Sequence, residues 1–148
     1  MPKDTARELK QRAVVHLARR EHSREELAAK LAPYAESETD IETVLNELVA
    51  KGLLSDHRFA EVRVNVRAKK YGSMKIAYEL RSKGVAPEII NAVLGNAGDE
   101  LSRAREIWRR KFGVTPADAK SRAQQMRFLL SRGFTGEVVS KVLGGKDE

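Results

Sequence analysis

The chain has 148 residues, and its 28 Lys and Arg against 21 Asp and Glu give a formal net charge of +7 at pH 7. Its hydrophobic content of 41% is enough for a buried core and argues against a disordered chain. The chain contains no cysteine, and this excludes disulfides, thiolate nucleophiles and cysteine-ligated metal sites. Neither a signal peptide nor a run of roughly 18 apolar residues is visible. We therefore expect a soluble, cytoplasmic protein that makes no membrane contact and attracts anionic partners.

A repeat organises the chain. Leu31, Leu80 and Leu129 lie 49 residues apart, and the segments 80–95 and 129–144 agree in most of their apolar positions. Three more apolar columns share the spacing: Ile41, Ile90 and Val139; Val44, Val93 and Val142; Leu45, Leu94 and Leu143. Such self-similarity is typical of tandem modules that share apolar surface with their neighbours. We expect an all-α protein, monomeric, with three tandem three-helix modules and about nine helices in an elongated array.

The first module is expected over residues 6–52. Ser23 and Glu26 form a capping box at the start of its second helix, and Gly52 provides a left-handed exit from the third. The inward residues at helical spacing are Leu9, Ala13 and Leu17, then Leu27 and Leu31, then Ile41, Val44, Leu45 and Leu48.

The second module is expected over residues 53–97. Asp56 is the predicted N-cap of its first helix, whose inward stripe is Phe59, Val62 and Val66. The chain restarts at Gly72-Ser73, the second helix presents Ile76 and Leu80 and ends before Gly84, and Pro87 suits the first turn of the third.

The third module is expected over residues 98–145. Its first helix should bury Leu101, Ala104, Trp108 and Phe112. A second helix opens at 115–118 and presents Ala119, Ala123, Met126 and Leu130, and a third presents Val138, Val139, Val142 and Leu143.

The sequence contains no recognisable catalytic chemistry. No phosphate-binding glycine loop with its lysine occurs, and His16, His22 and His57 lack the spacing that places two imidazoles on one helix face. His22 precedes the Ser23 cap, so we interpret it as a structural residue that interacts with the carbonyl end of the first helix. We therefore expect no enzyme activity, no catalytic residues, no metal and no cofactor.

The positive charge is concentrated in the second and third modules. Residues 1–52 carry a net charge of −1, whereas 53–97 and 98–148 carry +4 each. Arg63, Arg67 and Lys70 follow i, i+4, i+7 spacing and predict a basic ridge. Because unpaired like charges repel, a nearby anionic partner is the economical explanation. The candidate contacts with a partner protein or DNA are Arg63, Arg67, Lys69, Lys70, Tyr71, Lys75, Arg81, Lys83, Arg105, Arg109, Arg110 and Lys111.

Four segments resemble the RecX regulatory proteins of bacteria. They are ARREHSREELAAKL at 18–31, LSDHRFAE at 54–61, the Tyr71-Gly72 pair, and IAYELRSKGV at 76–85. The resemblance covers nearly the whole chain and is looser in the third module.

This resemblance implies a non-enzymatic modulator of the RecA recombinase, with roles in recombination, DNA repair and the SOS response. It further implies binding to RecA and to its filament on single-stranded DNA, in the filament groove, with suppression of ATP hydrolysis, strand exchange and co-protease action. Double-stranded DNA is a further candidate partner. The alternative is a non-specific DNA-binding helical protein that acts without a recombinase, since three-helix modules resemble helix-turn-helix units.

Overall fold

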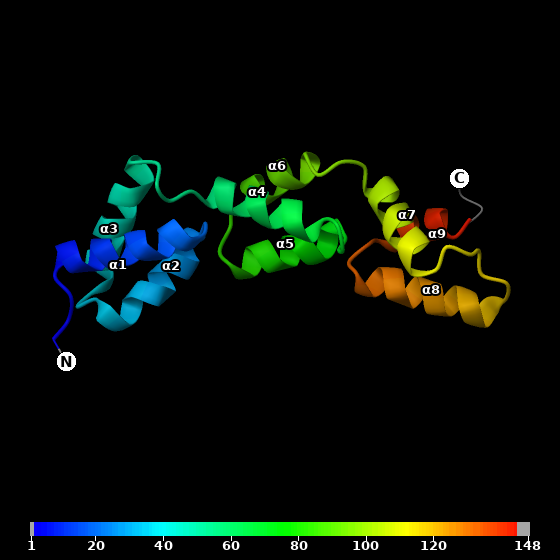
Figure 1. Cartoon of the computed structure of the whole chain (residues 1–148), viewed down its shortest axis with the longest axis horizontal. Coiled ribbons are helices and arrows are strands. Elements are labelled where there is room, and N and C mark those ends of the chain that lie inside the picture. The colour runs from blue at the N-terminus through cyan, green and yellow to red at the C-terminus, as the bar shows by residue number, and fades with distance from the viewer. Residues whose placement is uncertain (1, 145–148) are drawn as a thin grey trace. The chain divides into compact units, whose positions relative to one another are not determined.

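The computed structural model describes residues 2–144, and all regular structure within them is helical (Figure 1). The predicted all-α class is therefore confirmed. The elements are α1 (Ala6–Arg19), α2 (Arg24–Leu31), the 3-10 turn η1 (Ala32–Tyr34), α3 (Glu38–Ala50), α4 (Asp56–Arg67), α5 (Ser73–Ser82), α6 (Pro87–Gly95), α7 (Glu100–Lys111), α8 (Ala119–Ser131) and α9 (Gly136–Val142). Residue 145, the predicted end of the third module, lies outside the described residues.

The chain forms two compact units. Unit 1 contains residues 1–62 and 80–89, and unit 2 contains 63–79 and 90–148. The division passes through α4, α5 and α6, so the helices of the predicted second module contribute to both units.

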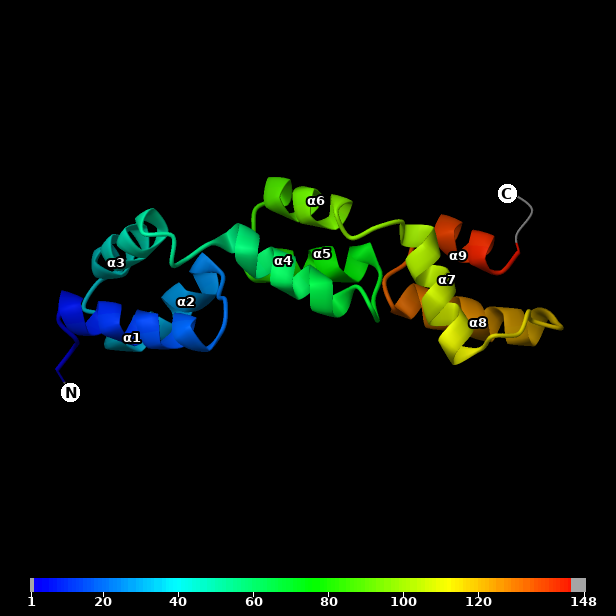
Figure 2. The ribbon, with the colours of Figure 1, turned by 45° about the horizontal axis from the view of Figure 1, so that its top comes forward.

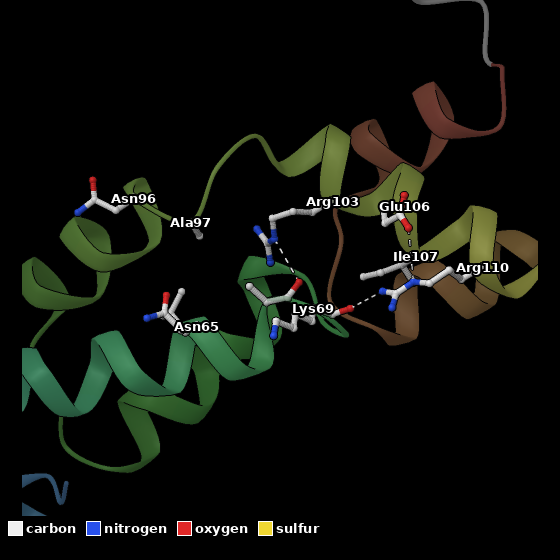
Figure 3. Close-up of a pocket in the computed structure, with 10 residues that line it drawn as sticks. Asn65, Lys69, Asn96, Ala97, Arg103, Glu106, Ile107 and Arg110 are labelled. Carbon is white, nitrogen blue, oxygen red and sulfur yellow. Dashed lines mark hydrogen bonds and ion pairs between the residues drawn. The ribbon is translucent and has the colours of Figure 1, made fainter.

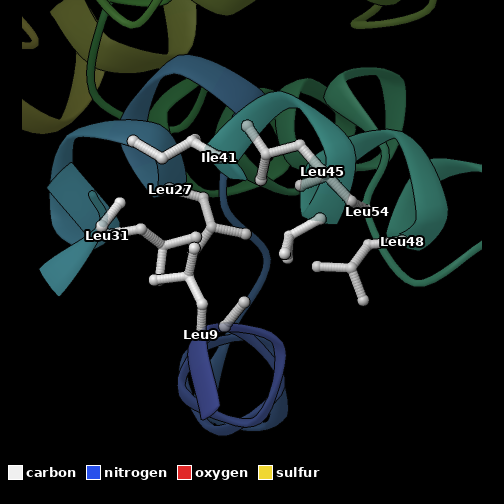
Figure 4. Close-up of a cluster of buried hydrophobic side chains, with 10 residues drawn as sticks. Leu9, Leu27, Leu31, Ile41, Leu45, Leu48 and Leu54 are labelled. Carbon is white, nitrogen blue, oxygen red and sulfur yellow. The ribbon is translucent and has the colours of Figure 1, made fainter. Parts of the chain in front are cut away.

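The core of unit 1 is built by α1, α2 and α3, as the spacing predicts (Figure 4). Leu9 and Ala13 from α1 meet Leu27 and Leu31 from α2, and all four are at most 1% exposed. The four predicted residues of α3 complete the cluster, and Leu17 packs against its edge. Gly52 leaves α3 with a φ of 75°, as expected.

The Ser23–Glu26 capping box is present, and it includes a salt bridge that the sequence pattern does not show. The Ser23 hydroxyl accepts from the Glu26 amide at 3.1 Å, and Glu26 in turn accepts from the Ser23 amide. The Arg20 guanidinium donates two hydrogen bonds to the same carboxylate, of 3.2 and 2.7 Å. Burial alone would raise the pKa of Glu26, but the hydrogen bonds and charge of Arg20, together with Ser23, outweigh it and lower the pKa to about 2.

His22 is a structural residue, as expected, but it acts as a neutral group. Its side chain is buried, and burial lowers its pKa, with the nearby Arg20 and Lys30 charges acting in the same direction. Nδ1 lies 3.1 Å from the Arg20 carbonyl and Nε2 lies 2.8 Å from the Lys30 ammonium. A neutral ring that donates from Nδ1 and accepts at Nε2 satisfies both contacts, so the interaction is a hydrogen bond rather than a charge at a helix end.

The start of α4 and its inward stripe differ from the prediction. Ser55 rather than Asp56 caps the helix, because its hydroxyl accepts from the Arg58 amide at 3.1 Å. Asp56 instead accepts from the first amide of α2, that of Arg24, at 2.7 Å. Phe59 is buried as expected, but Val62 and Val66 are 51% and 64% exposed, and Ala60 and Val64 are buried in their place.

The core of unit 2 is formed by α7, α8 and α9, which lie together in Figure 2. Ala104, Val139 and Leu143 are buried as predicted, whereas Leu130 is 43% exposed and the neighbouring Leu129 is fully buried. Two further buried side chains, Ile107 and Phe134, were absent from the predicted stripes. Trp108 is only partly buried, and its indole donates to the buried Gln125 side chain at 2.7 Å.

The same interhelical junction is built once in each unit. In unit 1 the turn before α2 meets the turn before α6, where the Ser23 hydroxyl donates to the Lys83 carbonyl at 2.7 Å. In unit 2 the turn before α5 meets the turn before α9, where the Gly72 amide donates to the Arg132 carbonyl at 2.7 Å. Ser23 and Gly72 are 49 residues apart, as are Lys83 and Arg132, so the repeat places corresponding turns in contact, through a side-chain donor in unit 1 and a backbone donor in unit 2.

Candidate nucleic-acid interface

The twelve predicted contact residues are divided between the units. Unit 2 holds ten of them, and unit 1 holds Arg81 and Lys83. Arg81 is exposed in the last turn of α5. The Lys83 ammonium lies 3.9 Å from the Glu26 carboxylate, so its charge is partly balanced within unit 1.

The predicted ridge on α4 is not an exterior face. Because Val64 rather than Val62 or Val66 is buried, the helix turns Arg63 and Arg67 towards its packed side, and both are half-buried. Lys70, the third member of the proposed ridge, is exposed beyond the end of the helix. The i, i+4, i+7 spacing therefore does not produce one continuous basic surface.

Arg67 is also paired, whereas the predicted ridge treats its charge as unpaired. Its Nε donates to Glu79 Oε1 at 3.0 Å, and the hydrogen bond to Glu79 is the main reason why the pKa of Arg67 is raised. Its guanidinium lies 4.2 Å from the centre of the Tyr71 ring. The Lys75 ammonium approaches the same ring at 4.9 Å, so Tyr71 is enclosed by cations rather than free to stack.

The exposed charge of unit 2 is concentrated where the end of α4 approaches α7. Lys69 and Lys70 are exposed after α4, and Arg105, Arg109, Arg110 and Lys111 are exposed on α7. Arg109 forms two hydrogen bonds to Glu106, of 3.3 and 2.6 Å, so it is the most compensated of this set. Because both partners are largely exposed, we expect this pair to contribute little to stability.

A cleft of about 430 Å³ lies between α4, the chain after α6, and α7 (Figure 3). Asn65 and Lys69 border it on one side and Arg103, Glu106 and Arg110 on the other. The Arg110 guanidinium donates to the Lys69 carbonyl at 2.7 Å and so links the two walls. This contact fixes two predicted basic residues beside each other.

Arg103 was not predicted, yet it holds the turn that positions Lys69, Lys70 and Tyr71. Its side chain is only 13% exposed, and it donates to the Tyr71 carbonyl and to Glu100, both at 2.7 Å. Glu100 also accepts from the Ser73 amide at 3.0 Å, which satisfies an amide at the start of α5. The pair of Glu100 and Arg103 is local, but no local sequence signal marks its contacts with Ser73 and Tyr71, which are about 30 residues away in the chain.

Two residues that are not among the predicted contacts border a second cleft on this side of unit 2. Arg132 and Phe128 line it together with the predicted Lys69, Lys70 and Arg110. The repeat carried a signal for Arg132, since it lies 49 residues after Lys83, which was among the predicted contacts.

The histidines and carboxylates are the potential metal ligands in the part of the chain that the structure describes. Within that part, no group of three or more potential ligands could hold a metal ion. His57 lies 3.6 Å from Glu61 one turn away, in an exposed pair. Residues 2–144 also contain no helix with the length and apolar character that a bilayer crossing requires.

Comparison with known proteins identifies the family. Two family models match the chain: the second three-helix domain of RecX over residues 55–94 and the third over residues 98–143. The chain belongs to the RecX family. The regulatory protein RecX of Leptothrix cholodnii is 51% identical over 91% of this chain and 87% of its own, and that of Herminiimonas arsenicoxydans is 47% identical over 95% and 93%.

Solved RecX structures have the same fold. The crystal structure of RecX from Lactobacillus salivarius matches with a TM-score of 0.82 over 93% of this chain and 94% of its own, at 19% identity. A second RecX crystal structure matches with a TM-score of 0.74 over 95% and 74%, at 20% identity. The helical three-helix-domain fold is therefore confirmed, and so is the family inferred from the four sequence segments.

Proposed function

We propose that this chain regulates the RecA recombinase, by binding RecA and its filament on single-stranded DNA. The observation that carries the proposal is membership of the RecX family, with relatives named regulatory proteins that are 47% and 51% identical over nearly the whole chain. The exposed cations of unit 2 support a polyanionic component in the complex, because they attract phosphates at long range. The chain acts as a cytoplasmic monomer and without catalysis.

The proposed effect is inhibition of ATP hydrolysis, strand exchange and co-protease activity. A chain of linked three-helix modules in the filament groove can contact more than one recombinase subunit, and weak contacts then combine through effective concentration. Inhibition requires that the chain bind one filament state better than another, because equal affinity shifts no equilibrium. The near-neutral first block and the two basic blocks suit contacts with protein and DNA respectively.

The test measures DNA-dependent ATP hydrolysis by RecA filaments at ratios of this chain to RecA well below one. Inhibition together with co-sedimentation supports the proposal. If neither occurs, the proposal is wrong.

A matched pair of double variants tests the role of the basic surface. Lys69→Gln/Lys70→Gln removes two exposed charges from unit 2, and Arg7→Gln/Arg19→Gln removes two exposed charges from α1. We expect the first to weaken inhibition several-fold more than the second, since only the first removes candidate phosphate contacts.

The alternative function is non-specific DNA binding without a recombinase partner. The concentration of exposed cations in unit 2 is compatible with it. Salt-sensitive binding to naked DNA with no effect on RecA would favour this alternative.

A further inference from the structure

The second cleft of unit 2 is lined mainly by basic side chains. It has a volume of about 330 Å³, and five basic residues line it: Lys69, Lys70, Arg110, Lys111 and Arg132. No carboxylate is among the residues that line it in the described part of the chain. Arg110 has a distant ion pair with Glu106, at 3.8 Å, outside the cleft lining. The hollow therefore combines a high positive potential with little internal compensation.

Among the basic residues of this cleft, Arg132 lies against two aromatic rings. Its guanidinium carbon lies 5.3 Å from the centre of the Tyr71 ring and 4.8 Å from that of Phe128. Two aromatic rings thus restrict one guanidinium without neutralising it. Among residues 2–144, no carboxylate forms an ion pair with Arg132. Its donors remain available for a planar, two-point contact with an anion.

Backbone hydrogen bonds connect the walls of this cleft. The Arg132 carbonyl accepts from the Gly72 amide at 2.7 Å, and the Gly133 carbonyl accepts from the Met74 amide at 3.1 Å. The Arg110 side chain joins α7 to the Lys69 carbonyl on the opposite wall. Since three separate segments are held together before any ligand arrives, little ordering is required on binding.

We propose that this cleft binds a backbone phosphate of single-stranded DNA, with Arg132 as the direct phosphate ligand. The proposal rests on the proposed function and assigns its direct DNA contact to Arg132, which the basic ridge did not include. The volume is at the small end of ligand sites, which suits one nucleotide unit rather than a large ligand. Phe128 borders the same hollow, so a flexible strand can set a base against the edge of its ring while its phosphate meets Arg132.

The test measures binding of a labelled oligothymidylate to the full chain by fluorescence anisotropy across a salt series, without RecA. For Arg132→Gln we expect a dissociation constant raised about five-fold and a log–log salt slope smaller by about 0.7, the loss of one single-strand phosphate contact. Arg132→Lys keeps the charge and should retain most of the slope while binding more weakly, because it loses the guanidinium fork.

Arg127→Gln is the matched control, because it removes the same charge from an exposed site on α8 that does not line the cleft. Equal effects of Arg132→Gln and Arg127→Gln, or wild-type binding by Arg132→Gln with native circular dichroism, would overturn the proposal. So would an equal effect of Arg132→Gln on duplex binding. Since RecA is absent, failure here is distinct from failure to inhibit the recombinase.

Discussion

The close approach at Gly72 allows a quantitative test of the unit 2 junction. A Cβ on this residue would lie 2.4 Å from the Gly133 oxygen and 2.7 Å from the Phe134 nitrogen, about 1 Å inside ordinary contact distance. These are backbone atoms, so no change of rotamer can relieve the overlap. Gly72→Ala must therefore separate the turn before α5 from the turn before α9.

The expected cost follows from the contacts that this separation breaks. The hydrogen bonds from Gly72 to Arg132 and from Met74 to Gly133 each contribute about 1 kcal/mol. Residual overpacking adds about 1 to 3 kcal/mol. We therefore expect Gly72→Ala to lower the free energy of unfolding of unit 2 by about 3 to 5 kcal/mol.

Urea unfolding followed by tryptophan fluorescence measures this change, because Trp108 is the single tryptophan of the chain and lies in unit 2. Gly95→Ala is the control: a Cβ there meets nothing within 4 Å, and alanine at the end of α6 should be neutral or stabilise by up to about 1 kcal/mol. If the two variants unfold at the same urea concentration, the close approach at Gly72 has been misjudged.

Three further predictions concern ionisable groups. Burial lowers the pKa of His22, so the stability that neutral His22 contributes is complete above about pH 6.5 and is lost as the pH falls. In the wild type the urea midpoint should therefore decline from pH 7.5 to 5, and in His22→Asn this decline should be smaller. Glu26→Gln breaks the ion pair with Arg20 and should lower the free energy of unfolding by about 2 kcal/mol at pH 7. In the wild type the same stabilisation should disappear between pH 4.5 and about 2, which acid titration followed by circular dichroism measures. Arg103→Met should destabilise unit 2 by about 2 to 4 kcal/mol in the tryptophan assay, since Glu100 and the Tyr71 carbonyl lose their donor; an unchanged midpoint would contradict this role.

Local patterns predicted the features that depend on neighbouring residues. The capping box at Ser23, the left-handed glycine at position 52 and the inward leucines of α1 and α2 are all present as expected. Each depends on residues within one or two helical turns, so a few side chains decide the outcome. The errors on α4 and α8 have a related cause, because several apolar residues lie one or two positions apart and each position rotates the side chain by about 100° around the helix.

The sequence by itself determined a helical repeat chain, its family and the blocks in which positive charge accumulates, because period, caps and net charge are properties of composition and spacing. Only the tertiary structure decided which cations are available. Arg67 at the end of α4 is paired with Glu79 on α5, whereas Arg132 is enclosed by aromatic rings contributed by α8 and by the chain after α4. Pairing, burial and cation–π contacts depend on segments far apart in the chain, and their relative positions follow from backbone junctions such as that between Gly72 and Arg132.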